Sequence, residues 1–270
     1  LPDRHATAST LARTSLTRAA SFPRPYPPMP QTTLTRDSSA PALDHLPGED
    51  TWLASIAGYV DTLGFIALFG LFTAHVTGNF ILIGSGLAGA GQGLLIKWLA
   101  FPAFVFGIIA ARVLYNLLSP RSHGTRAFAL YVMQAALLAG FMVAGVVAAP
   151  VTSPDTPIAI ACGLLGAAAM GVQNAHGRLT ARSVVANTVM TGNVTQAVID
   201  AFDLLTSRRD IKSRQTARTR LMRTLPPVAG FAIGASAGAA GFLIASFWAL
   251  LLPLVALCIL ASCAWHARDR

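Results

Sequence analysis

Two stretches of the sequence share one pattern: GYVD at residues 58–61 is followed by HVTGN at 75–79, and GVQN at 171–174 is followed by VMTGN at 189–193. The spacing between the two elements is nearly the same in both copies. A second Thr-Gly-Asn could arise by chance, but a matched upstream element at the same spacing is less easily accidental. The pattern therefore predicts an internal repeat that divides the chain into two homologous halves.

Composition places these halves in a membrane. The chain is 54% hydrophobic and only 11% charged, whereas soluble domains carry about 25% charged residues. After residue 51, long apolar stretches alternate with short polar breaks, which is typical of several transmembrane helices. We therefore expect an all-α integral membrane domain over residues 50–267, with a first half at 52–149 and a second half at 157–266.

Eight apolar segments are predicted, and two of them are unusual. The second is short and rich in glycine, and the sixth carries many Asn, Thr, Gln and Asp side chains. Polar segments of this kind are tolerated at membrane depth only where they face protein or a water-filled cavity. The segments lie at about 52–72, 76–91, 95–118, 126–149, 157–177, 186–206, 225–244 and 246–266.

The distribution of Lys and Arg favours six crossings over eight. If the second and sixth segments enter and leave on one side, nearly all basic residues after residue 51 lie on the cytoplasmic side and only Lys97 lies outside. We then expect about six transmembrane helices plus two re-entrant segments, inverted repeats, and both termini in the cytoplasm. The basic run 207–223 is interpreted as a cytoplasmic loop that sets topology, and contact with anionic lipid headgroups is the alternative.

Residues 1–48 differ from the membrane domain. They are rich in Ser, Thr, Pro and Arg and poor in large aliphatic residues. Such a segment buries too little apolar surface to fold, so we expect a disordered cytoplasmic tail. Because Met29 lies shortly before the first apolar segment, part of this tail could also be an over-extended start.

The repeated Thr-Gly-Asn motif combines a hydroxyl, a bare backbone and an amide. At the start of a half-helix, such groups can bind a solute or an anion, whereas the alternative is that the Asn side chains only tie helices together. The predicted substrate-binding residues are the two motifs with their upstream polar partners: Asp61, Thr77, Gly78, Asn79, Asn174, Thr191, Gly192 and Asn193.

Asp61 is the most informative single residue. It lies inside the first apolar segment with no Lys or Arg near it in sequence, where a carboxylate costs about 2.5–3.5 kcal/mol unless it is paired or protonated. A titrating or cation-binding role is one reading, and a hydrogen bond to the broken helix from an aqueous vestibule is the other. His75 and His176 adjoin the motifs and are weaker candidates for proton transfer.

Several classes of function are disfavoured. The net charge of +9 comes from basic residues between apolar segments, so we expect no nucleic-acid partner. The sequence has no phosphate-binding loop, zinc-protease motif or nucleophile elbow, and its three cysteines lack metal-ligand spacing. We therefore expect no enzyme activity, no cofactor and no metal; the expected partners are the lipid bilayer and a small solute or ion, and association into a homo-oligomer is left open.

These elements resemble the YoaK family of bacterial multi-pass membrane proteins, a domain of unknown function. The resemblance rests on GYVD at 58–61, VTGN at 76–79 and the run AMGVQN at 169–174 that leads to TVMTGN at 188–193. It covers roughly residues 50–267. The resemblance implies a protein of the bacterial inner membrane and names no substrate.

The expected function is that of a secondary transporter-like carrier for a small solute. The alternative is a non-transporting membrane scaffold or stress-linked protein in which the Thr-Gly-Asn motifs only pack helices. The two readings differ in whether changes at Asp61 and Asn193 alter a solute flux or only stability.

Overall fold

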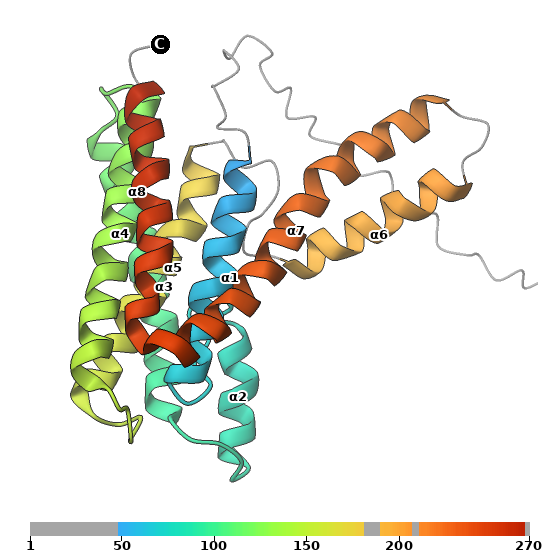
Figure 1. Cartoon of the computed structure of the whole chain (residues 1–270). Coiled ribbons are helices and arrows are strands. Elements are labelled where there is room, and N and C mark those ends of the chain that lie inside the picture. The colour runs from blue at the N-terminus through green and yellow to red at the C-terminus, as the bar shows by residue number, and fades with distance from the viewer. Residues whose placement is uncertain (1–47, 181–189, 207–210, 268–270) are drawn as a thin grey trace, which may run out of the picture. The chain divides into compact units, whose positions relative to one another are not determined.

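The computed structural model describes residues 48–180, 190–206 and 211–267, which form helices with no strand among them. Residues 1–47, most of the predicted disordered tail, lie outside this range. The helices, labelled in Figure 1, are α1 (Glu49–Ala67), α2 (Gly78–Leu87), α3 (Leu94–Leu117), α4 (His123–Ala148), α5 (Pro157–Leu179), α6 (Met190–Thr206), α7 (Ile211–Ala245), the short 3₁₀ helix η1 (Ser246–Leu250) and α8 (Leu251–His266).

The helices fit a membrane protein, which confirms the all-α class. By length and composition, α3, α4, α5 and the stretch Ile211–His266 could each cross a bilayer. The last of these contains α7 and α8, separated by η1, where Ser246 has a left-handed backbone with φ of 49°. The number of crossings stays a prediction.

The six helices of the bundle alternate in direction along the chain. In Figure 1, α1, α4 and α7 run one way, while α3, α5 and α8 run the other way, so α1 begins and α8 ends at the same end. At the opposite end, α2 lies between the end of α1 and the start of α3. With 10 residues, α2 is about 15 Å long, which is half the thickness of a bilayer core.

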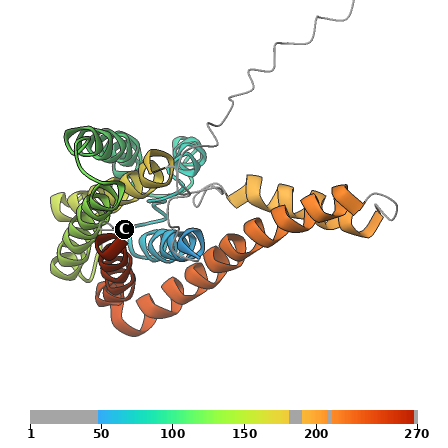
Figure 2. The same cartoon turned by 90° about the horizontal axis from the view of Figure 1, so that it is seen from above.

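Helices from the two halves pack against each other. The most extensive contacts join α1 to α7 and α3 to α5, and α4 packs on both α5 and α8 (Figure 2). Among the described helices, α2 packs only on α3, and α6 packs only on α7. The core of the bundle is therefore built from α1, α3, α4, α5, α7 and α8.

Glycines allow the backbones of α1 and α7 to touch. A Cβ atom at Gly58 would overlap the carbonyl oxygen of Phe231, and one at Gly234 would overlap that of Ser55. Small residues permit this close approach in membrane helix packing.

The crossing of α3 and α5 has the same construction. A Cβ atom at Gly171 would overlap the carbonyl oxygen of Phe104, and one at Gly107 would overlap that of Ala168. Both crossings thus place a glycine of each helix against the backbone of its partner, and α7 adds Gly238, where a Cβ atom would overlap the carbonyl oxygen of Tyr59.

The first helix ends earlier than the predicted boundary at residue 72. Phe69 and Gly70 both have positive φ, 52° and 79°, and the Gly70 N–H donates to the carbonyl of Phe65 at 2.9 Å. This left-handed turn closes the last helical carbonyls and reverses the chain. The segment Leu68–Thr77 then connects α1 to α2.

The predicted loop at 207–223 is wrong from residue 211 onward, because α7 begins at Ile211. Arg and Lys suggested a loop, but together with Ala, Gln, Leu and Met they are good helix formers. The hydroxyls of Thr216 and Thr219 donate to carbonyls one turn back, at 2.9 Å each. Residues 207–210 lie outside the described range.

Candidate functional site

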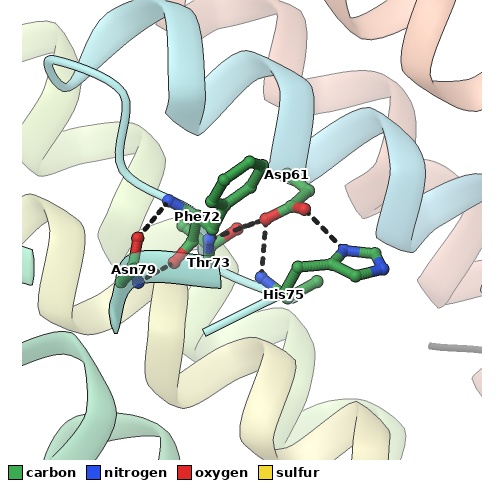
Figure 3. A network of polar contacts seen from close by, with 6 residues as sticks. Asp61, Phe72, Thr73, His75 and Asn79 are labelled. Carbon is green, nitrogen blue, oxygen red and sulfur yellow. Dashed lines mark hydrogen bonds and ion pairs between the residues drawn. The ribbon is translucent and has the colours of Figure 1, made fainter. Parts of the chain in front are cut away.

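Asp61 organises the loop that follows α1. It is 4% exposed, and its Oδ1 accepts hydrogen bonds from the backbone N–H groups of Thr73 and Ala74 at 2.7 Å each. The Thr73 hydroxyl donates to the same oxygen at 3.3 Å. The carboxylate is thus satisfied by the returning chain, as Figure 3 shows. These contacts agree with the reading in which Asp61 hydrogen-bonds the broken helix.

Asn79 closes the same loop from the start of α2. Its side-chain oxygen accepts from the Phe72 N–H at 3.0 Å, and its amide donates to the Phe72 carbonyl at 2.8 Å. Asn79 is buried, whereas Thr77 is exposed and makes no side-chain cap of the helix. The Asn79 amide therefore satisfies both backbone groups of Phe72, and no side chain caps the start of α2.

His75 occupies the remaining carboxylate oxygen. Its Nδ1 lies 2.7 Å from Oδ2 of Asp61, and its side chain is 33% exposed. Because an ionised carboxylate only accepts, Nδ1 carries the proton in this pair. The hydrogen bond to Asp61 raises the pKa of His75 above its ordinary value, although partial burial acts in the opposite direction.

A cavity of about 420 Å³ lies beside this pair. Its walls include Phe65, Phe72 and Phe231 along with Asp61 and His75. The His75 ring meets Phe231 edge-on, with centroids 5.3 Å apart, and Phe65 lies 4.8 Å from Phe72. The volume is in the range of small-molecule sites, which combine apolar walls with a few polar groups.

Comparison with known proteins identifies the family. Residues 51–263 match the family described as a protein of unknown function, DUF1275. The chain belongs to the DUF1275 family. No curated protein and no solved structure matches the chain. The narrower resemblance to YoaK proteins stays a prediction.

In this DUF1275 protein the second Thr-Gly-Asn motif lies in the first turn of α6. Thr191 and Gly192 are exposed, and Asn193 is buried. Since α2 and α6 do not contact each other, the structure does not bring the two motifs into one polar patch. Asn174 lies on α5, and residues 181–189, between it and the motif, are outside the described range.

A second polar cluster of the DUF1275 protein lies away from this site and was not predicted. Gln173 on α5 donates to the carbonyl of Leu53 at 2.8 Å and accepts from Gln134 on α4 at 2.7 Å. One turn along the same two helices, Tyr131 donates to Glu49 and its ring lies 4.3 Å from that of His176. The available signals were Gln134 inside the apolar segment 126–149 and Gln173 inside 157–177.

The polar clusters have no arrangement typical of a metal site. Among residues 48–180, 190–206 and 211–267, no three His, Cys, Asp or Glu side chains come together as metal ligands do. The chemistry that the described site offers is therefore charge, hydrogen bonding and aromatic contact.

Proposed function

We propose that this protein is a membrane carrier that exchanges a small organic cation for a proton. The observation that carries the proposal is His75, held by the buried Asp61 carboxylate at an aromatic-lined cavity. That the protein is helical and suited to a membrane does not depend on this proposal.

Asp61 and His75 would divide the work. Both oxygens of Asp61 already have partners within the protein, so this carboxylate supplies charge and positions the imidazole. Nε2 of His75 points away from Asp61 (Figure 3), and the residue lines the cavity. His75 is thus the titratable group that a bound solute would meet.

Charge and aromatic walls favour a cation as the solute. When His75 is neutral, the pair carries one negative charge, and Nε2 offers a lone pair to a donor. The rings of Phe72 and Phe231 lie beside it in T-shaped contacts, and the electron-rich faces of aromatic rings attract organic cations. The carboxylate of Asp61 would repel an anion whenever His75 is neutral.

A proton and such a cation would exclude one another. Protonation of His75 cancels the charge of Asp61 and removes the lone pair on Nε2. A carrier whose site holds either ligand, but not both, exchanges one for the other across the membrane. Histidine titrates in the physiological range, which suits this role.

The helix crossings support the two inverted halves that a carrier of this kind would use. Ser55 and Gly58 are three residues apart on α1, as Ala168 and Gly171 are on α5. Their partners on the other helices also keep one spacing: Phe104 and Gly107 on α3, and Phe231 and Gly234 on α7. The alternating helix directions (Figure 1) fit an inversion.

The test is uptake of benzyltrimethylammonium, a permanent cation, into proteoliposomes with an acidic interior. We expect uptake above that of protein-free liposomes, while benzoate, an anion with the same ring, shows none. His75→Gln keeps a polar side chain that cannot titrate, so it should bind the cation with no dependence on pH. Equal uptake with and without protein, at every pH, would overturn the proposal.

Binding should also follow pH in the direction that the site dictates. The affinity for benzyltrimethylammonium is expected to fall as pH drops through the pKa of His75, which Asp61 raises. Isothermal titration of the purified protein across this range measures the fall. An affinity that is flat, or that rises with acidity, contradicts competition between proton and cation.

A scaffold without transport is the second candidate, and one observation favours it. The side-chain oxygen and nitrogen of Asn79 both hydrogen-bond the backbone of Phe72, so this motif residue has a structural role. Under this reading, Asp61→Asn and Asn193→Ala alter stability and leave every flux unchanged. The uptake experiment separates the two candidates.

We further propose YoaK-type membership, location in the bacterial inner membrane, and six crossings with both termini cytoplasmic. Single cysteines at Gln92, Ser122, Thr180 and Ser213, in a chain without its own cysteines, test the topology. Gln92 accessible from outside and the other three from the cytoplasm would support inverted halves. Gln92 accessible from the cytoplasm, with Ser122 and Thr180 outside, would indicate eight crossings.

A further inference from the structure

The arm formed by α6 and residues 211–225 of α7 is unlike the rest of the described chain. Among the described helices α6 contacts only α7, and Figure 1 shows the two running antiparallel beside the bundle. The feature is independent of the cavity at His75.

The inner seam of the arm is polar and specific. Arg220 donates to Oδ1 of Asp200 from Nε at 3.0 Å and from a terminal nitrogen at 2.7 Å. The side-chain amide of Gln196 donates to the same oxygen at 3.0 Å. Asp200 is fully buried, as is Ala217 on the facing side of α7. This seam fixes which faces of the two helices meet.

The outer surface of α6 is apolar. At 3.6 residues per turn, one stripe contains Val194, Val198, Phe202 and Leu205, and Phe202 and Leu205 are 63% and 75% exposed. Gln196 and Asp203 lie on the other flank of the seam. The helix therefore has an apolar and a polar side, as interfacial helices do.

The apolar side continues onto α7. Ile211, Met222 and Leu225 are exposed and share one flank of that helix with Arg214 and Arg218. On each helix this flank is reached from the seam by turning in the direction in which residue numbers increase. In an antiparallel pair of right-handed helices, such flanks face the same side. The exposed apolar side chains of α6 and α7 therefore lie on one side of the arm, together with Arg214 and Arg218.

Length keeps the arm out of the bilayer interior. The 35 residues of α7 extend about 52 Å at 1.5 Å per residue, against about 30 Å of hydrocarbon core. Pro226 and Pro227 separate the basic part of the helix from the apolar part that follows. A single span from Pro227 onward would leave the arm, with its charges and its exposed apolar side chains, outside the core.

Charge indicates what covers the exposed side. The described residues of the arm, 190–206 and 211–225, contain five Lys and Arg against two Asp, and Asp200 is already paired with Arg220. A surface that combines apolar side chains with an excess of cations matches the boundary of an anionic bilayer, where nearby cations favour binding.

We propose that the α6–α7 arm lies on the membrane surface, with its apolar side in the headgroup boundary and Arg214 and Arg218 against anionic lipid headgroups. A second copy of the chain on the same side is the competing occupant. Lipid is favoured because like-charged arms would place their arginines against each other.

Spin labels distinguish these occupants in lipid nanodiscs. Labels at V198C and F202C probe the apolar side, and labels at Q196C and D203C are the matched controls, all in full-length protein lacking Cys162, Cys258 and Cys263. We expect molecular oxygen, which concentrates in lipid, to relax the first pair several-fold more than a water-soluble nickel chelate does, and the reverse for the controls. Preferential relaxation of V198C and F202C by the chelate would overturn the proposal. So would protection from both agents with spin–spin broadening between copies.

Headgroup charge is tested separately. In nanodiscs of phosphatidylcholine mixed with phosphatidylglycerol, the lipid exposure of V198C should exceed that in phosphatidylcholine alone. R214Q/R218Q should abolish this difference, while the matched R214K/R218K keeps it. An equal response of both double variants would contradict a charge-dependent contact.

Discussion

The two Thr-Gly-Asn motifs are alike in burial and unlike in surroundings. In each, the threonine is exposed and the asparagine is buried. Asn79 holds a loop that also contains Asp61 and His75, whereas Asn193 lies in an amphipathic helix that packs only on α7. The same tripeptide thus starts two helices with different neighbours, and its own residues do not determine what is built around it.

The helix crossings, unlike the motifs, have the same surroundings in both halves. There the halves agree, with glycine against backbone at α1–α7 and again at α3–α5. The proposed repeat therefore keeps its packing and changes its polar chemistry. The proposed carrier thus combines two helix crossings of the same construction with one charged pair.

The largest expected effect strikes the part in which the halves agree. Gly58→Ala and Gly171→Ala each put a Cβ atom into a backbone carbonyl, so the helices must separate. We expect losses at or above the about 1–3 kcal/mol typical of overpacking, similar at both sites, measured by thermal unfolding in detergent.

Gly84→Ala is the matched control, because a Cβ atom there meets nothing within 4 Å. Alanine is the better helix former, by up to about 1 kcal/mol, so this variant should be unchanged or slightly more stable. A large effect at Gly58 and a small one at Gly171 would break the proposed symmetry.

The next effect falls where the halves differ. Asp61→Ala leaves the buried N–H groups of Thr73 and Ala74 without their acceptor, at about 1–3 kcal/mol for a buried unsatisfied group. Asp61→Asn keeps one acceptor oxygen and should be milder. Unfolding midpoints of the two variants measure the difference. If both variants match the wild type, the loop does not depend on this side chain.

Asn79→Ala is expected to be weaker than Asp61→Ala. It removes two hydrogen bonds to Phe72 at one place, with a net contribution of about 0.5–1.5 kcal/mol each. Proteolysis or hydrogen exchange in residues 68–77 would report the loosened loop directly. Unchanged exchange in this segment would contradict the role assigned to Asn79.

The helical bundle and the importance of Asp61 could be predicted from the sequence, for physical reasons. Apolar stretches identified the bundle, and a carboxylate inside one of them identified Asp61, because burying a charge requires a reason. The loop and cavity were not accessible. They depend on where Phe231 of a distant helix lies against His75, which no local pattern encodes.

Two other features were missed for different reasons. Glu49 precedes the first apolar segment, and only tertiary packing brings it to Tyr131. The helix over residues 211–223 was not predicted, because its basic residues suit a cytoplasmic loop as well as a helix. A neutral polar side chain inside an apolar segment, such as Gln134, indicates a buried hydrogen bond just as the charge of Asp61 does.

The smallest expected effect tests what the two motifs share. Thr77→Val and Thr191→Val replace exposed hydroxyls, and the hydroxyl of Thr77, the N-cap residue of α2, makes no cap hydrogen bond, so each change should stay within about 0.5 kcal/mol. The comparison is sharp because valine matches threonine in shape and removes only the hydroxyl. Unfolding midpoints that fall for Thr77→Val alone would show that the first motif uses all of its polar groups. Equal, near-zero shifts would indicate that the asparagine is the residue of each motif that matters for stability. The two motifs would then differ only in the residues around that asparagine.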